Sequence, residues 1–279
     1  MKIFSSGRGL NSPEFYRRKK RRARLKLALI SVCLLVILCL LVYLSRQERF
    51  IIIEATVLEE DITDREEIVS VVQGLLAHHY FWVIPQANAL IYPRQAIRQN
   101  LLSTFPRIKS VDLKVENLRT LSISVEERVP VAMYCGDSMD ISELSGCFLV
   151  DGGGFIFATA PDLAHDAYLI YTTQIPIEEP IGKRVTTPEE FGVLSKFIST
   201  LTALDVHPAT FEIGTDEYTL SLLGGGKIIW RRNANLTLIH SNLEAFLLAD
   251  AIKAQKNFLD RVLLLDLRIE NKIFYRFKN

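Results

Sequence analysis

The side chains that could do acid–base or metal chemistry are few and scattered along this chain. The five histidines are His78, His79, His165, His207 and His240. None belongs to an H-E-x-x-H metal-binding helix or to a spaced Cys/His pair, and no G-x-S-x-G nucleophile turn is present. Because catalysis needs several such groups held together, the sequence predicts no catalytic residue, no metal site and no cofactor.

Two triple-glycine runs, Gly152–Gly154 and Gly224–Gly226, are the segments that come nearest to a phosphate-binding loop. Neither has the G-x-x-x-x-G-K-[ST] spacing, and each lies between two short strand-like runs. We therefore interpret both as hairpin turns, with Asp151 as a turn residue before the first run. No small-molecule substrate is predicted.

Cys135 and Cys147 flank a polar loop and belong to two strand-like runs. If the runs pair as a hairpin, the two cysteines face each other, and an oxidising compartment would allow a disulfide between them. Two reduced, partly buried cysteines are the alternative. A zinc site is not expected, because no histidine lies nearby with ligand spacing.

The chain contains an uncharged, largely apolar run of eighteen residues, Leu27–Leu44. As a helix it would be roughly 27 Å long, close to the ~30 Å hydrocarbon core of a bilayer. Basic residues cluster between Arg17 and Lys26, which predicts a cytoplasmic N-terminus and an extracytoplasmic remainder. A buried core helix and a cleaved signal peptide are the alternatives. The run is long for a signal peptide and ends without a small-residue cleavage site.

The charge is divided unevenly. Residues 1–49 hold twelve Lys or Arg and two Glu, whereas residues 50–279 hold twenty-one Lys or Arg and thirty Asp or Glu. The basic tail, residues 1–26, is expected to be disordered and to contact anionic membrane lipid. Nucleic acid is not an expected partner, because the tail offers few aromatic residues for stacking, among them Phe15 and Tyr16, and the remainder is acidic.

Apolar periodicity predicts two regions of mixed secondary structure after the span. In residues 50–128 the expected elements are a strand at 50–57, a helix behind the capping box Thr63-x-x-Glu66, a helix between Pro93 and Pro106, and strands at 108–115 and 121–126. The aromatic cluster Tyr80-Phe81-Trp82 is interpreted as core packing, with an exposed docking patch as the alternative. In residues 129–279 short strands surround a helix capped by Thr187 and a helical segment at 236–256. The fold class is therefore α+β.

Four segments, taken in order, resemble motifs of the FtsQ/DivIB family of bacterial cell-division proteins. Phe105–Val111 resembles P-x-[VI]-x-x-[VA], Leu121–Ala132 resembles L-x-I-x-V-x-E-R-x-P-[VI]-A, Phe148–Phe157 resembles x-L-V-D-x-x-G-x-[VI]-F, and Leu265–Arg268 resembles [IV]-D-L-R. The resemblance implies a basic tail at 1–26, a transmembrane helix at 27–44, a POTRA-like β-α-α-β-β domain at 50–128 and a β domain with helices packed on its sheet at 129–279. The chain departs from the family in lacking a glycine turn after its first strand and in its loop 136–146.

The resemblance implies a non-enzymatic scaffold of the division machinery, crossing the plasma (inner) membrane once and located at the septum. It would link cytoplasmic ring components to septal wall synthesis. Its expected partners are small single-span coiled-coil proteins of the FtsB/FtsL or DivIC type and other division proteins. A transport or assembly module of the envelope is the alternative, because POTRA units also serve export.

The segment expected to bind these partners is the last strand. It contains Ile273, Phe274, Tyr275, Arg276 and Phe277. An edge strand leaves backbone groups open to a further strand, although this strand could also only complete the sheet. Arg128, in the Glu-Arg-x-Pro segment, is interpreted as one side of a structural ion pair between the two domains, with a partner contact as the alternative.

Overall fold

The computed structural model describes residues 13–59, 64–136, 146–161, 167–255, 258–270 and 272–278. The chain divides into two compact units, one made of Met1–Gln99 with Asp112–Ser124 and the other of Asn100–Val111 with Val125–Asn279. The division falls within strands β4 (Ile108–Glu116) and β5 (Thr120–Glu127). A mixed α+β fold with one apolar N-terminal helix and a large sheet is confirmed.

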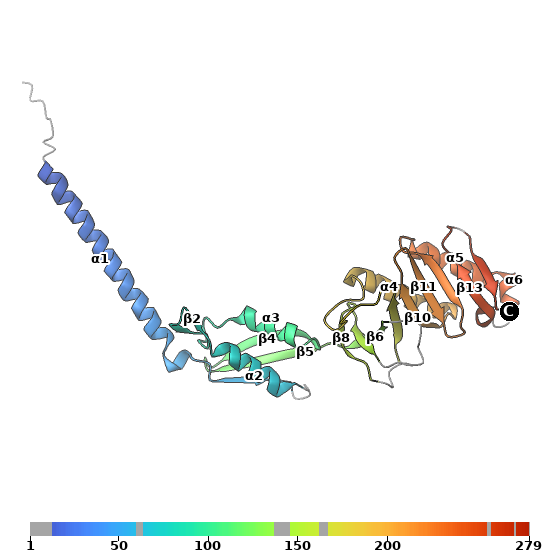
Figure 1. Ribbon diagram of the computed structural model, residues 1–279, viewed down its shortest axis with the longest axis horizontal. Helices are drawn as coiled ribbons and strands as arrows, with labels where there is room; N and C mark the ends of the chain where they lie inside the picture. Colours follow the sequence, from blue (N-terminus) through green and yellow to red (C-terminus); the bar gives the residue numbers. More distant parts are fainter. Residues whose placement is uncertain are drawn as a thin grey trace, which may run out of the picture. The chain divides into compact units, whose positions relative to one another are not determined.

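Helix α1 (Pro13–Ser45) is the long blue helix of Figure 1. Its stretch Lys19–Ser45 is 27 residues long, and the most apolar 18-residue window within it has a mean hydropathy of 3.1, so it is long and apolar enough to cross a membrane. None of the apolar window is buried within the protein. By length and composition, α1 therefore contains a segment that could span a bilayer.

The expectation of a disordered tail over residues 1–26 is wrong for the part from Pro13 onward, which is helical. Proline is tolerated in the first helical turn, and Arg, Lys and Ala are favourable helix residues. Once the apolar run has nucleated a helix, each further residue adds one hydrogen bond at little cost, so the helix extends into the basic segment. Residues 1–12 lie outside the described part of the chain.

The first unit is built on a sheet of order β1-β5-β4, in which β1 (Glu54–Val57) pairs with β5 in parallel. Helix α2 (Arg65–Leu76) packs against β1 through Ile68, Val72 and Leu76. Between α2 and α3 (Arg94–Thr104) the chain forms a small hairpin of β2 (His79–Tyr80) and β3 (Ile84–Pro85).

The sequence analysis and the structure of this unit differ at two points, and a third point cannot be compared. Strand β1 begins at Glu54 rather than at residue 50, because Glu48–Phe50 is a 3₁₀ turn and Ile52 N–H bonds to Ala87 O at 2.8 Å. The hairpin β2–β3 was not expected. The capping residue Thr63 lies outside the described residues.

In the second unit, the described residues form a mixed sheet of nine strands in the order β14-β13-β12-β11-β10-β9-β6-β7-β8. The strands are β6 (Pro130–Cys135), β7 (Cys147–Asp151), β8 (Ile156–Thr159), β9 (Leu169–Thr173), β10 (Pro208–Ile213), β11 (Glu217–Leu222), β12 (Lys227–Arg231), β13 (Val262–Asp266) and β14 (Phe274–Phe277). Both triple-glycine runs connect antiparallel neighbours, so the interpretation as hairpin turns is confirmed.

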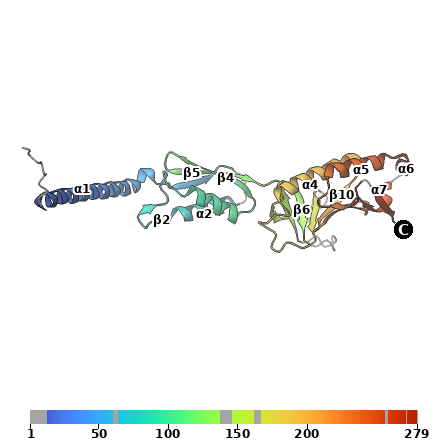
Figure 2. The same cartoon turned by 90° about the horizontal axis from the view of Figure 1, so that it is seen from above.

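Helices α4 (Pro188–Leu201) and α5 (Leu236–Leu248) lie along one face of the large sheet (Figure 2). The short helices η2 (Thr202–Leu204), α6 (Asp250–Lys253) and α7 (Phe258–Arg261) follow α4 and α5 along the chain. The core beneath them is centred on large side chains that are fully buried, namely Tyr134, Tyr171, Phe191, Phe211 and Trp230. As predicted, Thr187 caps α4, its Oγ1 accepting a hydrogen bond from Glu190 N.

Candidate partner-binding edge of the large sheet

Strand β14, which contains four of the five residues predicted to bind partners, is an outer strand of the nine-stranded sheet. It pairs antiparallel with β13, Tyr275 lying opposite Leu265 and Phe274 opposite Asp266. Among the described residues, no strand lies on its other side. Half of its backbone N–H and C=O groups therefore point away from the sheet, which is the arrangement that strand addition requires.

The two faces of β14 differ. On the helix side, the ring of Tyr275 lies 5.6 Å from that of Phe246 and 5.8 Å from that of Phe258, and Phe277 lies 5.7 Å from Phe258. Because strand residues alternate in direction, Phe274 and Arg276 point to the opposite face, where both are exposed. The strand is thus anchored on one face and offers an aromatic and a basic side chain on the other.

Both ends of β14 are tied to neighbouring segments. After the strand, Lys278 N–H bonds to Arg261 O at 2.9 Å, and Lys278 Nζ donates to Asp260 O and Gly224 O. Before it, Ile273 packs against the main core. Three of the five residues in the predicted partner segment, Ile273, Tyr275 and Phe277, thus have packed side chains, and only Phe274 and Arg276 direct their side chains away from the helices.

The Asp-Leu-Arg segment closes the connection between β13 and β14. Arg268 donates to Asp266 from Nε to Oδ1 at 3.0 Å and from Nη2 to Oδ2 at 2.7 Å, and its Nη1 reaches Glu217 Oε2 on β11 at 3.1 Å. Hydrogen bonds from Arg268 lower the pKa of Asp266 below its ordinary value, although partial burial opposes this. Arg268 therefore links the end of the β13–β14 pair to β11 through two charge-assisted hydrogen-bonded pairs, one with Asp266 and one with Glu217.

A cluster around Glu190 was not found from the sequence. Arg232 reaches both carboxylate oxygens, from Nε at 2.9 Å and from Nη2 at 2.8 Å, and the hydroxyls of Tyr218 and Thr186 donate to the same carboxylate. Burial alone would raise the pKa of Glu190, but hydrogen bonds from Arg232, Thr186 and Tyr218 outweigh it and lower that pKa. Burial of the Tyr218 side chain, together with the hydrogen bond to Glu190 and the charge of Glu190, raises the pKa of Tyr218. The only signal in the sequence was the cap Thr187-x-x-Glu190.

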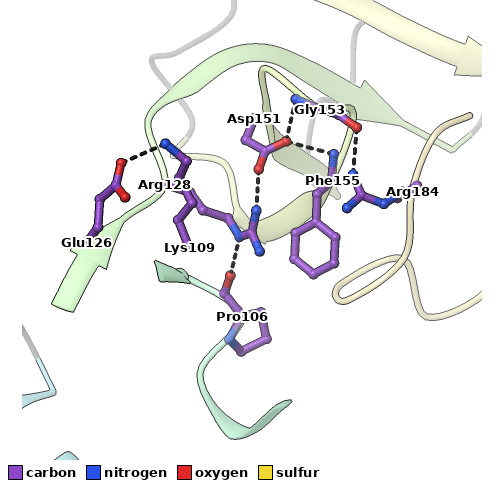
Figure 3. A network of polar contacts seen from close by, with 8 residues as sticks. All are labelled: Pro106, Lys109, Glu126, Arg128, Asp151, Gly153, Phe155 and Arg184. Carbon is purple, nitrogen blue, oxygen red and sulfur yellow. Dashed lines mark hydrogen bonds and ion pairs between the residues drawn. The ribbon is translucent and has the colours of Figure 1, made fainter. Parts of the chain in front are cut away.

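Arg128 organises the opposite end of the large sheet (Figure 3). It pairs with Asp151 through Nη1, its Nε donates to Pro106 O at 3.0 Å, and its guanidinium lies 4.0 Å from the centre of the Phe155 ring. Only 15% of the Arg128 side chain and 11% of the Asp151 side chain are exposed. Arg128 is thus part of a structural ion pair, as predicted, but the expectation that the pair joins two domains is wrong, because both residues belong to the second unit.

Asp151 has a second role in the turn after β7. Its Oδ1 accepts hydrogen bonds from Gly153 N at 2.8 Å and Phe155 N at 3.0 Å. Arg184 closes the turn from the outside by donating to Gly153 O at 2.7 Å. Asp151 therefore serves as the predicted turn residue, and the Arg128 pair fixes this turn in place.

A disulfide joins Cys135 at the end of β6 to Cys147 at the start of β7. The two residues are opposite each other in the antiparallel β6–β7 hairpin, with Cα atoms 4.4 Å apart. The bridge closes the loop between the strands, most of which, residues 137–145, lies outside the described part of the chain. Of the two alternatives that the sequence left open, the structure has the bridged one.

The interpretation of Tyr80-Phe81-Trp82 as core packing is wrong for two of the three residues. Phe81 and Trp82 are each 93% exposed, while Tyr80 is half-buried. Phe81 and Trp82 form the turn of the β2–β3 hairpin, and both have a positive φ, 47° for Phe81 and 64° for Trp82. Side chains at such a turn point outward, so they cannot reach the helix interface that the apolar pattern suggested.

The histidines that the structure describes are not gathered at one site. His78 and His79 are exposed, His79 being the first residue of β2, His207 contacts the Asp205 carbonyl at 3.0 Å, and His240 lies on α5. His165 is outside the described residues. Within the part of the chain that the structure describes, no group of three or more His, Cys, Asp or Glu side chains could hold a metal ion.

A hollow of about 790 Å³ lies beside β9, β10 and α4. Its described lining is apolar or hydroxylic, with Tyr168, Ile170, Ser195 and Thr210 among its residues, and it contains no acid, base or histidine. Such a lining supplies packing surface and weak hydrogen bonding.

No family model matches the chain, and no curated protein matches it.

Proposed function

We propose that this protein is a non-enzymatic, single-span membrane scaffold of the bacterial division machinery, with an extracytoplasmic POTRA-like domain and a β domain. It docks an extended segment of a small coiled-coil division protein against β14. In this way it links cytoplasmic ring components to septal wall synthesis through protein–protein contacts.

The observation that carries this proposal is the open outer side of β14, with Phe274 exposed next to it. A partner segment in extended conformation would gain main-chain hydrogen bonds from the open groups and side-chain contact from Phe274 and Arg276. The strand is only four residues long, so the added strand is short and its affinity depends on these side chains.

Three further features support the proposed arrangement. The stretch Lys19–Ser45 could span a bilayer behind a basic segment, which favours an N-terminus inside the cell. The Cys135–Cys147 bridge fits an oxidising compartment. The order β1-α2-α3-β4-β5, with the β2–β3 hairpin inserted between the helices, fits a POTRA-like unit, and the ordered motifs resemble those of the FtsQ/DivIB family.

A binding experiment with the full chain in lipid nanodiscs tests strand addition. Phe274→Asp should weaken the binding of a candidate coiled-coil division protein by about tenfold or more, equivalent to ~1.4 kcal/mol. Val193→Asp on α4 is the matched control, because Val193 is 58% exposed and Phe274 is 52% exposed. The control should leave the affinity unchanged within about twofold.

Deletion of residues 273–279 is the stronger variant and should abolish binding. Fluorescence of the buried Trp230 shows whether the second unit stays folded. An intact fold with unchanged affinity would reject strand addition at β14. Localisation of a fluorescent fusion tests the wider proposal, since a division scaffold must gather at midcell and an even distribution along the membrane would contradict it.

A transport or assembly module of the envelope is the second candidate. One observation favours it, namely that β4 is also an outer strand, nine residues long, in the sheet of order β1-β5-β4. Its exposed side chains are mostly charged, among them Lys109, Asp112 and Lys114, and such charges discourage strand pairing. A normal septum with defective export of envelope proteins in a depletion strain would favour this candidate.

A further inference from the structure

The β2–β3 turn places two of the largest apolar side chains of the protein in the most exposed position available. Phe81 and Trp82 are each 93% exposed, and Val83, Leu90 and Ile91 beside them are exposed as well. We call these five residues the hairpin patch. The hydrogen bond from Tyr80 OH to Ile91 O brings the segment 90–91 to the hairpin. Singly exposed apolar residues are ordinary, but several of them gathered at one turn mark an interaction surface.

The patch is held in a defined conformation. Val83 N–H bonds to Tyr80 O at 3.1 Å across the turn, and Tyr80 OH donates to Ile91 O at 3.3 Å. Phe81 and Trp82 keep positive φ, a conformation that bulky residues disfavour and that glycine or asparagine would adopt more easily. Two aromatic residues at these positions gain nothing from packing within the described protein, so another environment must favour them.

The patch is attached to the end of the helix that could span a bilayer. Arg46, one residue beyond α1, donates from Nε to Val83 O at 3.0 Å. Asn88, only 3% exposed, donates from Nδ2 to Ser45 O, the last carbonyl of α1, at 2.9 Å. These contacts lie within the first unit, and Figure 1 shows β2 beside the end of α1.

Backbone hydrogen bonds reinforce this attachment. Ala89 N–H bonds to Phe50 O at 2.7 Å, and Ile52 N–H bonds to Ala87 O at 2.8 Å. The segment that follows the span is thereby paired with the segment that follows the hairpin. The height of the hairpin patch relative to the end of the span is therefore set by the fold.

We propose that the hairpin patch inserts into the lipid interface next to the point where α1 leaves the bilayer, as a second membrane contact of the first unit. Trp and Phe are the side chains that best occupy the zone between head groups and acyl chains. Arg46 and Arg49 lie at the same end of α1 and would contact lipid phosphates there. The lipid would replace water around Phe81 and Trp82, and this accounts for aromatic residues in a turn that the protein itself leaves bare.

This inference rests on the proposed membrane anchoring, and the experiment separates the two. The full chain is reconstituted in phosphatidylcholine–phosphatidylglycerol vesicles, with and without acyl chains brominated near the head group, which quench tryptophan by contact. The chain has two tryptophans, Trp82 and Trp230, so the difference between the wild type and Trp82→Phe isolates the Trp82 emission. Trp230 is fully buried and provides the constant background.

Brominated lipid should reduce the Trp82 emission by roughly half or more, because an interfacial side chain lies ~5–10 Å into the head-group and acyl boundary. The matched control is Leu58→Trp in the Trp82→Phe background. Leu58 is exposed and belongs to the same unit. It follows the last residue of β1, whereas α1 lies before the first residue of that strand. Its emission should change little with brominated lipid.

Two other results would overturn the inference in different ways. If the chain floats with the vesicles but Trp82 is not quenched, or becomes shielded only when a partner protein is added, the patch does not bind lipid and the membrane anchoring stands. If the chain remains in the aqueous fraction, the proposed anchoring fails and the second membrane contact fails with it.

Discussion

The two outer strands of the nine-stranded sheet, β8 and β14, differ in whether another backbone segment hydrogen-bonds to the outer side of the strand. Along β8, Ile156 N–H bonds to Lys183 O at 2.9 Å and Gly182 N–H bonds to Ile156 O at 2.8 Å, so residues 182–183 cover the edge. Along β14, the described residues supply no such cover. The same sheet thus satisfies one edge with its own chain and leaves the other available, and this difference is what favours β14 as the docking edge.

The ion pairs near the two edges also differ, in how far their side chains are exposed to solvent. The Arg128–Asp151 pair beside the β7–β8 turn is largely buried, whereas Arg268 near β14 is 41% exposed in its pair with Asp266. A buried pair with additional hydrogen bonds is costly to break, and an exposed pair is not. The covered edge is therefore expected to be the rigid one.

The largest predicted effect is that of Arg128→Ala. It leaves Asp151 buried without its counter-charge and should lower the free energy of unfolding of the second unit by ~3–5 kcal/mol. Arg268→Ala, the matched change at the open edge, should lower the free energy of unfolding much less, because its ion pairs with Asp266 and Glu217 are exposed to solvent. Urea unfolding of the full chain, followed by the fluorescence of Trp230, measures both. Equal losses in the two variants would remove the distinction between the edges.

A smaller difference is expected between the two triple-glycine turns. Gly154 has φ +71°, and an added Cβ would lie 2.9 Å from Cγ of Phe191, so Gly154→Ala should cost ~2–4 kcal/mol through strain and crowding. Gly225 has φ +81° but open space, its nearest atom being Lys278 Nζ at 3.5 Å, so Gly225→Ala should cost only ~1 kcal/mol. Thermal unfolding of both variants gives the comparison, and a larger loss at Gly225 would contradict it.

The smallest predicted effect concerns pH at the open edge. The pKa of Asp266 is lowered in the folded protein, so its contribution to stability is present above the unfolded pKa of ~3.9 and is lost as pH falls through the lower folded value. Asp266→Asn should therefore make the unfolding free energy less dependent on pH between ~5 and ~2, by ~0.5–1 kcal/mol in total. If the unfolding free energies of the variant and the wild type changed equally with pH, the Asp266–Arg268 pair would contribute nothing to the pH dependence of stability.

Local patterns in the sequence were enough to predict most of the helices and strands that depend on nearby residues. Apolar periodicity identified α2, α3, β4 and β5, the cap at Thr187 identified the start of α4, and the uncharged run identified the helical segment that could span a bilayer. These features depend on neighbours a few residues apart, which is the range over which helix and strand periodicities act. The paired positions of Cys135 and Cys147 followed in the same way from two short strands and one loop.

The sequence did not predict which edge of the sheet is covered, nor that Phe81 and Trp82 are exposed, because these features depend on how distant segments pack. β14 follows β13 in the sequence, but its outer position results from the order of nine strands, and the cover on β8 comes from a segment some twenty-five residues later in the chain. Phe81 and Trp82 look like core residues in an apolar run, yet the hairpin turns them outward. Such outcomes depend on contacts between segments far apart in the chain, which local patterns do not encode.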